Sequence, residues 1–392
     1  MRPTWRSWLR PLPLWERAAQ QCNMKGWVRG WRRTPHPTLL IETPVLPSPT
    51  RGEGAIIRLR ICRTLLALVA FCALTATNAT AQTKVRLAVG GKPAMFYLPL
   101  TVTERLGYFK EAGLDIEISD FPGGARALQA LMGGSADVVA GAFDHTIQMQ
   151  AKGQRIVGVV EIGQFPGFVL GVLTAKAANY KSHADLKGMK IGITAPGSST
   201  HFMARYLMAQ AGLKDDDASF IGIGAGPTAV AAARHGEIDA LVNVDPVISI
   251  LESEKAIKVV ADTRTLEGTR QVFGGAYPAA VIYVTPAYVQ ANGATVQAIT
   301  NAMVRGLRWI GTHSPEEIAN VMPPEYALGD KDNYVRSIKA SMPMFSPDGR
   351  FGGEGPEVAL KVLSKFDPTV AKASIDLSAT YTDAFVDKAP AK

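Results

Sequence analysis

The stretch Phe121–Asp144, FPGGARALQALMGGSADVVAGAFD, carries most of the information about the fold. A Gly-Gly pair precedes an Ala/Leu-rich run, a second Gly-Gly pair ends that run, and an apolar segment then leads to Phe143-Asp144. Glycine pairs punctuate secondary structure because glycine adopts turn conformations without steric cost. The stretch therefore predicts a tight turn, a short helix and a buried strand.

The same pattern returns about a hundred residues later in Gly226–Asp245, GPTAVAAARHGEIDALVNVD. At an offset of 102 residues, five pairs of identical residues align: Gly124 with Gly226, Ala127 with Ala229, Ala130 with Ala232, Gly134 with Gly236 and Asp137 with Asp239. A structural unit that occurs twice predicts two similar lobes. We expect the functional site to lie between them.

The segments around each copy predict an α/β fold, because strand and helix patterns alternate along the chain. The predicted strands are Lys84–Val89, Asp115–Ile118, Asp137–Gly141, Met189–Thr194 and Ser219–Ile223. Two apolar extended segments, Gly167–Thr174 and Ala279–Thr285, are predicted to be crossover strands between the lobes. Helices are predicted at Leu98–Tyr108, Thr200–Gln210, Val296–Ser314, Pro356–Ser364 and Asp376–Val386, and the C-terminal part is expected to pack on the first lobe.

The first 81 residues differ in composition from the rest of the chain. They hold 12 Lys+Arg against 3 Asp+Glu, all three cysteines and five of the six tryptophans, whereas the other 311 residues hold 30 basic and 31 acidic residues. The overall net charge of +8 therefore does not indicate a nucleic-acid partner. We predict no nucleic-acid binding.

Residues 58–81 have the pattern of a secretory signal peptide. Three arginines precede the ten apolar residues Leu65–Leu74, and Ala79-Thr80-Ala81 forms a small-x-small cleavage site before Gln82. The apolar run is too short to span a bilayer. We predict a periplasmic protein cleaved before Gln82, and we interpret residues 1–57 as a disordered extension from a mis-assigned translation start.

Catalytic motifs are absent from the sequence after residue 81. It contains no Gly-x-Ser-x-Gly, no P-loop, no cysteine and no histidine pair with metal-ligand spacing. The lack of cysteine excludes thiol chemistry, disulfides and cysteine-bound zinc from this part. We predict a protein that is not an enzyme and that uses no cofactor or metal.

Ligand binding is better supported, because parallel sheets bind ligands at the carboxyl ends of their strands. The loops expected there are Gly90–Pro99, Asp120–Ala125, Gly141–His145, Ala195–His201, Gly222–Thr228 and Asn243–Pro246. Several of these loops lead directly into helices. Their free N–H groups and the positive end of the helix dipole attract anions.

Each candidate in these loops also has a structural alternative. Gly123 and Gly124 let a ligand approach the backbone, or serve only as a strand-to-helix turn. The hydroxyls of Ser198–Thr200 contact a ligand, or provide a helix N-cap. Phe96 and Tyr97 form the wall of a pocket, or anchor the core.

Four further side chains remain open in the same way. His201 contacts ligand or packs at the seam between the lobes, and Asp144 and Asp245 contact ligand or cap the segments that follow their strands. Arg126, on the first turn of the predicted motif helix, is either a counter-charge for an anion or part of a solvated helix face.

Motifs along Val85–Ala389 resemble, in the right order, the nitrate/sulfonate/taurine-type family of periplasmic solute-binding proteins of ABC importers. They are Leu98-Pro99, Leu106-Gly107-Tyr108-Phe109, Glu111–Ile116, Gly123-Gly124, Asp185–Gly192, Gly197–His201 and Gly236–Ala240. The resemblance implies the two-lobed type II periplasmic binding fold, with a mixed sheet flanked by helices in each lobe and two crossover strands. Residues 82–170 and 276–392 would form lobe I, and 171–275 lobe II.

The resemblance also implies a function. A monomer would capture a small organic anion of the sulfonate or carboxylate type between its lobes and deliver it to ABC permease and ATPase subunits. The predicted ligand-binding residues are Phe96, Tyr97, Gly123, Gly124, Ala125, Phe143, Asp144, Gln164, Phe165, Ser198, Ser199, Thr200, His201, Asp245 and Tyr277. The alternative is a binding protein for a thiamine pyrimidine precursor, or a related enzyme of the same fold; that enzyme carries a cysteine-rich segment that residues 82–392 lack.

Overall fold

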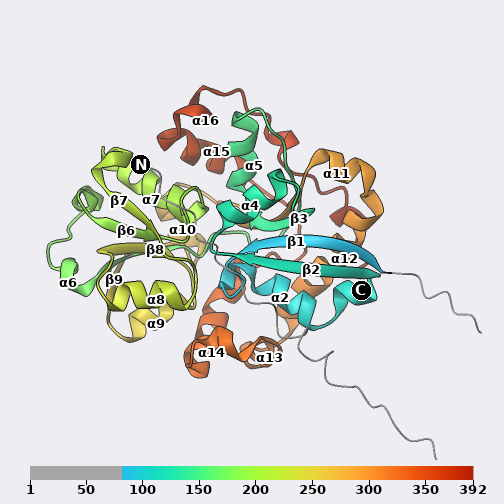
Figure 1. Cartoon of the computed structure of the whole chain (residues 1–392), viewed down its shortest axis with the longest axis horizontal. Helices are drawn as coiled ribbons and strands as arrows, with labels where there is room; N and C mark the ends of the chain where they lie inside the picture. The colour runs from blue at the N-terminus through green and yellow to red at the C-terminus, as the bar shows by residue number, and fades with distance from the viewer. Residues whose placement is uncertain (1–81, 392) are drawn as a thin grey trace, which may run out of the picture. The chain divides into compact units, whose positions relative to one another are not determined.

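Residues 82–391 are described by a computed structural model (Figure 1). The predicted extension 1–57 and the predicted signal peptide 58–81 lie outside the described residues. Within residues 82–391, every helix is too short or too polar to span a bilayer.

The first sheet has the strand order β2-β1-β3-β10-β4. Its strands are β1 (Thr83–Gly90), β2 (Leu114–Phe121), β3 (Val138–Ala142), β4 (Val157–Glu161) and β10 (Ala280–Val284). Strand β1 runs parallel to β2 and β3, whereas β10 runs antiparallel to β3 and β4. We call the part of the chain around this sheet lobe I.

The second sheet repeats this order as β7-β6-β8-β5-β9. Its strands are β5 (Val169–Leu173), β6 (Lys190–Ile193), β7 (Ser219–Gly222), β8 (Ala240–Asn243) and β9 (Ile257–Asp262). Strand β5 is antiparallel to β8 and β9, and β6 is parallel to β7 and β8. We call the part around this sheet lobe II. Two mixed sheets flanked by helices confirm the predicted fold class (Figure 1).

The repeated sequence motif forms the same structure in both lobes. Its helices, α4 (Gly124–Met132) and α8 (Pro227–Arg234), lead into β3 and β8. In lobe I, Asp137 N donates to the Arg86 carbonyl at 2.8 Å, and the Asp137 carboxylate accepts from Arg86 N at 2.9 Å. In lobe II, Asp239 and Lys190 exchange the same two hydrogen bonds at 2.8 and 2.9 Å.

The predicted crossover segments are the antiparallel strands β5 and β10. The chain passes from the first sheet to the second between Glu161 and Val169, and it returns between Asp262 and Ala280. Each segment is thus the first strand that the chain forms after it changes lobe. The exact lobe boundaries given above stay a prediction.

The remaining helices surround the two sheets. They are α2 (Leu98–Arg105), α3 (Tyr108–Glu111), α5 (Asp144–Ala151), α6 (Thr174–Ala177), α7 (Ser199–Gln210), α9 (Val247–Ser253), α10 (Leu266–Phe273), α11 (Pro286–Ala291), α12 (Gly293–Thr312), α13 (Pro315–Val321), α14 (Lys331–Ser341), α15 (Gly355–Phe366) and α16 (Pro368–Lys372). The helices predicted at Thr200–Gln210, Val296–Ser314 and Pro356–Ser364 correspond to α7, α12 and α15. The helix predicted at Leu98–Tyr108 is divided into α2 and α3 by Gly107, which has a φ of 78°.

The helix predicted at Asp376–Val386 is wrong. This segment contains only two short 3-10 turns, because its backbone pairs with strand β4 instead. Gly158 N donates to the Thr380 carbonyl at 2.9 Å, and Thr382 N donates to the Gly158 carbonyl at 2.9 Å. The segment therefore extends the edge of the first sheet.

The C-terminal helices contact both lobes. Helix α12 packs against α2 of lobe I, as the sequence predicts. Two further contacts reach lobe II: the Arg205 guanidinium of α7 lies 4.7 Å from the centre of the Phe366 ring, and the hydroxyls of Ser249 and Ser337 lie 2.5 Å apart. The C-terminal helices thus join the lobes outside the two connecting segments.

Candidate ligand-binding site

A cavity lies between the lobes, at the carboxyl ends of strands from both sheets. Gly90 ends β1, Ala142 ends β3, Thr194 follows β6 and Val244 follows β8. The centres of water-sized molecules can occupy about 30 Å³ of the cavity, and one water needs roughly 10–15 Å³ by this measure. In this conformation the lobes therefore leave room only for a small ligand.

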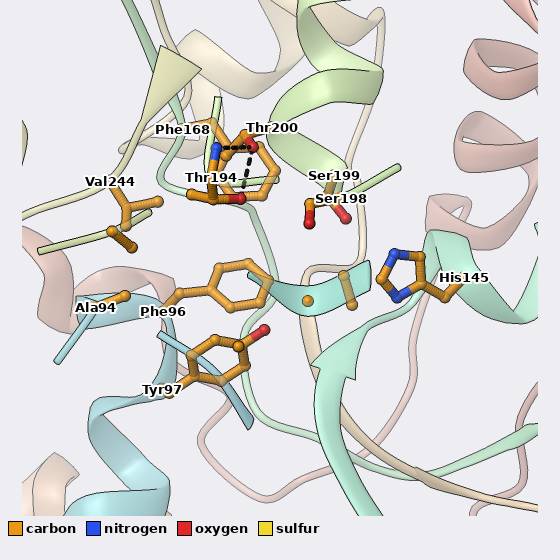
Figure 2. A pocket seen from close by; sticks show the side chains of 14 residues that line it. Ala94, Phe96, Tyr97, His145, Phe168, Thr194, Ser198, Ser199, Thr200 and Val244 are labelled. Carbon is orange, nitrogen blue, oxygen red and sulfur yellow. Dashed lines mark hydrogen bonds between the residues drawn. The ribbon is translucent and has the colours of Figure 1, made fainter. Parts of the chain in front are cut away.

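Three aromatic side chains line the cavity (Figure 2). Phe96 of lobe I stacks on Phe168 of the outgoing connection, with ring centres 5.4 Å apart and an interplanar angle of 20°. Tyr97 meets Phe96 edge-on at 4.9 Å. Burial raises the pKa of Tyr97, and its hydroxyl points inward among the lining residues in Figure 2. No hydrogen bond from the described residues reaches this hydroxyl, which leaves it available to a ligand.

Three hydroxyls at the start of α7 lie across the cavity from Phe96 and Tyr97 (Figure 2). Ser198 Oγ accepts a hydrogen bond from Ala125 N of lobe I at 3.0 Å. Thr200 Oγ1 accepts from Thr194 N at 3.1 Å and lies 2.9 Å from Thr194 Oγ1. Ser199 Oγ donates to Asp144 Oδ1 of lobe I at 2.7 Å. These hydroxyls line the cavity and also hold the protein together across it.

Asp144 lies behind the cavity lining and joins three parts of the chain. It is the first residue of α5, it is 1% exposed, and it accepts hydrogen bonds from Ser199 of α7 and from the Tyr277 hydroxyl at 3.2 Å. Burial raises the pKa of Asp144, although the neighbouring His145 and the hydrogen bonds from Ser199 and Tyr277 act in the opposite direction. The predicted site residues Asp144 and Tyr277 therefore form a buried link between the lobes.

His145 lines the cavity but was not among the predicted residues. Its Nε2 atom lies 3.2 Å from the Gly197 carbonyl of lobe II, and Nδ1 lies 3.5 Å from the Tyr283 hydroxyl. Burial lowers the pKa of His145, so that its imidazole is neutral near pH 7 and donates from Nε2 to the carbonyl. The cavity lining, formed by described residues, contains no lysine or arginine. Positive potential at the cavity comes instead from the N-termini of α4 and α7.

The glycine pair before α4 has two distinct positions. Gly124 lies on the cavity wall, where an added Cβ would lie 3.4 Å from His145 Cε1. Gly123 lies outside the lining, where an added Cβ would lie 2.8 Å from Ala195 Cβ and 3.1 Å from Ser198 Oγ, both in lobe II. Its φ of −171° is accessible to any residue. Gly123 is therefore required for the close approach of the lobes, not for its backbone conformation.

Six of the predicted site residues line the cavity together: Phe96, Tyr97, Gly124, Ser198, Ser199 and Thr200. Ala125 and Gly123 lie next to it at the lobe contact. Phe143 points into the core of lobe I, where its ring lies 5.9 Å from that of Phe351. Gln164 and Phe165 line a different cavity.

His201 and Asp245 also lie outside the lining, in lobe II. The His201 ring meets Phe220 at 4.4 Å, its Nδ1 accepts from Gly197 N at 3.0 Å, and burial lowers the pKa of His201 to about 4. Asp245 Oδ1 accepts from Ser249 N at 2.9 Å. Arg126 is exposed and donates to Gln129 at 2.9 Å, so its side chain belongs to a solvated helix face.

Eight lining residues were missed: Gly90, Ala94, Ala142, His145, Phe168, Thr194, Ala225 and Val244. Most of them lie in the loops that the sequence assigns to the carboxyl ends of strands, so the position of the loops was the available signal. Phe168 and Thr194 lie in segments that the sequence predicts as strands, and no signal marked them. Across residues 82–391, no cluster of three His, Cys, Asp or Glu is arranged to hold a metal ion.

Two similar α/β lobes around a cavity define a protein of the periplasmic binding fold. The chain belongs to the NMT1/THI5-like family, whose model matches residues 96–318. A protein from Bordetella bronchiseptica RB50 with a solved structure is 48% identical, with a TM-score of 0.76 over 79% of this chain and 97% of that one.

Two other similar proteins differ from each other in function: one is a binding protein and the other is an enzyme. The alkanesulfonate-binding protein SsuA of Xanthomonas axonopodis pv. citri, solved with MOPS bound, has a TM-score of 0.60 at 19% identity over 78% of this chain and all of that one. That likeness concerns the fold. The 4-amino-5-hydroxymethyl-2-methylpyrimidine phosphate synthase THI13 of Saccharomyces cerevisiae is 26% identical over 163 residues, which are 41% of this chain and 46% of the yeast enzyme.

Proposed function

We propose that the protein is the solute-binding component of an ABC importer, which holds a small solute between its lobes and delivers it to a membrane permease. One observation carries the proposal: the cavity at the strand ends is lined by strand ends and helix N-termini from both lobes. Such an arrangement couples solute binding to the distance between the lobes, because a solute that contacts both favours the state in which they approach.

The solute is a small organic anion of the sulfonate or carboxylate type. Two helix N-termini and the hydroxyls of Ser198 and Tyr97 suit an oxyanion, since Ser198 Oγ accepts from Ala125 N and keeps its own hydrogen to donate. The stacked rings of Phe96 and Phe168 suit an apolar or flat body. The cavity lining among the described residues provides no cationic side chain, so helix N–H groups and hydroxyls supply the charge compensation.

The lack of a cationic side chain also favours a second candidate solute, an uncharged heterocycle such as a thiamine pyrimidine precursor. A flat ring packs against the stacked Phe96 and Phe168. The neutral His145 lies on the same lining and offers no charge to a ligand. The family relationship to the yeast pyrimidine synthase supports this candidate as a ligand.

We further propose that the protein does not catalyse a reaction on its solute. Ser199 is hydrogen-bonded to the carboxylate of Asp144, and no histidine of residues 82–391 lies within hydrogen-bonding distance of its hydroxyl. Serine nucleophiles are typically activated by an adjacent histidine. His145, the histidine on the cavity lining, is directed to a backbone carbonyl and to Tyr283.

The partners and the location follow from the same proposal. The protein would act as a monomer with the permease and ATPase subunits of the importer, in the periplasm, after cleavage before Gln82. N-terminal sequencing of the secreted protein tests the cleavage. A mature chain that begins at Gln82 supports it, and one that retains the first tryptophans contradicts it.

A thermal-shift screen tests the function. Methanesulfonate, acetate, nitrate and 4-amino-5-hydroxymethyl-2-methylpyrimidine are compared at equal ionic strength. The proposal predicts that one class raises the melting temperature in a saturable way, since a ligand that binds the native state stabilises it. Turnover of a compound that does not raise the melting temperature would favour an enzyme instead.

A further inference from the structure

A second cavity lies between the lobes on the side of their connections. It is lined by Gln164 and Phe165 of the outgoing connection, by Ala276 and Pro278 of the returning one, by α10 of lobe II, and by the 346–355 loop of lobe I. We call it the hinge cavity. It offers about 310 Å³ to the centres of water-sized molecules, against about 30 Å³ in the cavity at the strand ends, which we call the cleft. The two cavities share no lining residue.

Glu161, the last residue of β4, lines the hinge cavity with an unpaired carboxyl group. The residue is 5% exposed, and no hydrogen bond or ion pair from residues 82–391 reaches its side chain. Part of its carboxyl group stays accessible, because its oxygens are not among the fully enclosed polar atoms without a partner in the described residues. A buried carboxylate without a partner is costly.

The neighbours of Glu161 in lobe I do not neutralise it. Asp348 and Asp383 add negative charge, and together with burial they raise the pKa of Glu161 well above its ordinary value. Arg350 also lines the cavity, but it pairs with Asp387 and lies 3.7 Å from Asp348. Its positive charge is therefore already compensated.

A basic side chain without an ion pair lines the same cavity from lobe II. Arg270 of α10 is exposed, and no carboxylate of the described residues lies within 4.0 Å of its guanidinium. Glu161 and Arg270 thus share a cavity without contacting each other. The cavity that both line has about 310 Å³ for the centres of water-sized molecules, which is room for a molecule that carries both charges.

We propose that the hinge cavity binds a small zwitterion, whose ammonium group pairs with Glu161 and whose anionic group pairs with Arg270. An ammonium group donates up to three hydrogen bonds, and a guanidinium holds a carboxylate with two parallel ones. The Phe165 and Pro278 side chains offer apolar contact to the carbon chain between the charges. Because the ligand would contact both lobes and both connections, its binding would change the affinity of the cleft for its solute.

The test uses ω-amino acids of increasing length, namely glycine, β-alanine and 4-aminobutanoate, with the full chain. The expected result is a saturable rise in melting temperature with at least one of them, and none with methylammonium or acetate at the same concentration. Calorimetry should show at least about tenfold weaker binding for Glu161→Gln and for Arg270→Ala, since each removes a charge-assisted contact. The control Glu267→Gln, also on α10, should bind as the wild type does.

Two results would overturn the proposal. One is the absence of any response to the three amino acids. The other is a response that Glu161→Gln retains and Ser199→Ala abolishes, which would locate the zwitterion in the cleft. The second result leaves the proposed solute-binding function standing, so the two proposals can fail separately.

Discussion

At Gly123 the backbone of lobe I touches lobe II at a point where no side chain fits. The position has ordinary extended dihedral angles, and the requirement for glycine comes from Ala195 and Ser198 across the cleft. The adjacent Ala125 N donates to Ser198 Oγ, so the close approach brings an interlobe hydrogen bond with it.

Gly123→Ala should therefore weaken solute binding by about tenfold or more, because the lobes lose both the contact and a hydrogen bond typically worth about 1 kcal/mol. Calorimetric titration measures the loss. Gly226→Ala is the matched control, since Gly226 precedes the equivalent helix of lobe II and an added Cβ there meets nothing within 4 Å. Equal affinity of the two variants would contradict the role of Gly123.

The sequence was informative about residue types at the site and less so about their contacts. The hydroxyl run Ser198–Thr200 and the aromatic pair Phe96-Tyr97 line the cavity, because their loops follow predictable strand ends. The direction of each side chain depends on packing between distant segments. Phe143 and His145 illustrate this: they are two residues apart at the start of α5, yet one points into the core and the other lines the cavity.

At the scale of elements, the two lobes are built from one repeated unit. The pairs Arg86–Asp137 and Lys190–Asp239 make the same backbone and carboxylate contacts, which explains why the two aspartates align in the sequence. Alternating patterns and glycine pairs predict such units, because they reflect local structure. The antiparallel insertion of β5 and β10 and the pairing of Tyr381 with Gly158 depend on contacts distant in sequence, and the sequence did not predict them.

Glu161, the last residue of β4, should make the stability of the protein depend on pH. Glu161 has a pKa raised above its ordinary 4.5, so the folded state holds a proton that the unfolded state releases. Stability from this group is therefore fully present below pH 4.5 and falls as pH rises through the raised pKa.

Glu161→Gln removes this dependence. Without zwitterion, the variant should unfold at a urea concentration similar to that of the wild type near pH 4.5, and at an increasingly higher one as the pH rises to 8. The pKa values of Asp144, Asp245 and Asp383 are also raised, but these residues are present in both the wild type and the variant. A difference between the two midpoints that stays constant with pH would contradict the assignment.

At the scale of the whole described chain, the lobes meet through polar contacts around the cleft and through the C-terminal helices. Ser199 and Asp144 join them beside the cavity, and Arg205 and Phe366 join them farther along α7. The cleft cavity has room for only a few water-sized groups, so a larger solute requires the lobes to separate before it enters. Solute binding and lobe movement are therefore expected to be coupled.

The most direct test of the two-lobe site is calorimetric titration of three proteins with the compound class that raises the melting temperature. The proteins are the wild type, Tyr97→Phe in lobe I and Ser199→Ala in lobe II. Both variants should bind about tenfold more weakly. Tyr97→Phe loses a hydrogen bond to the solute, and Ser199→Ala loses the hydrogen bond to Asp144 that joins the lobes. The solute-free melting temperature of Tyr97→Phe should equal that of the wild type, because no described residue bonds this hydroxyl. Wild-type affinity in both variants would show that the solute is not held between the lobes.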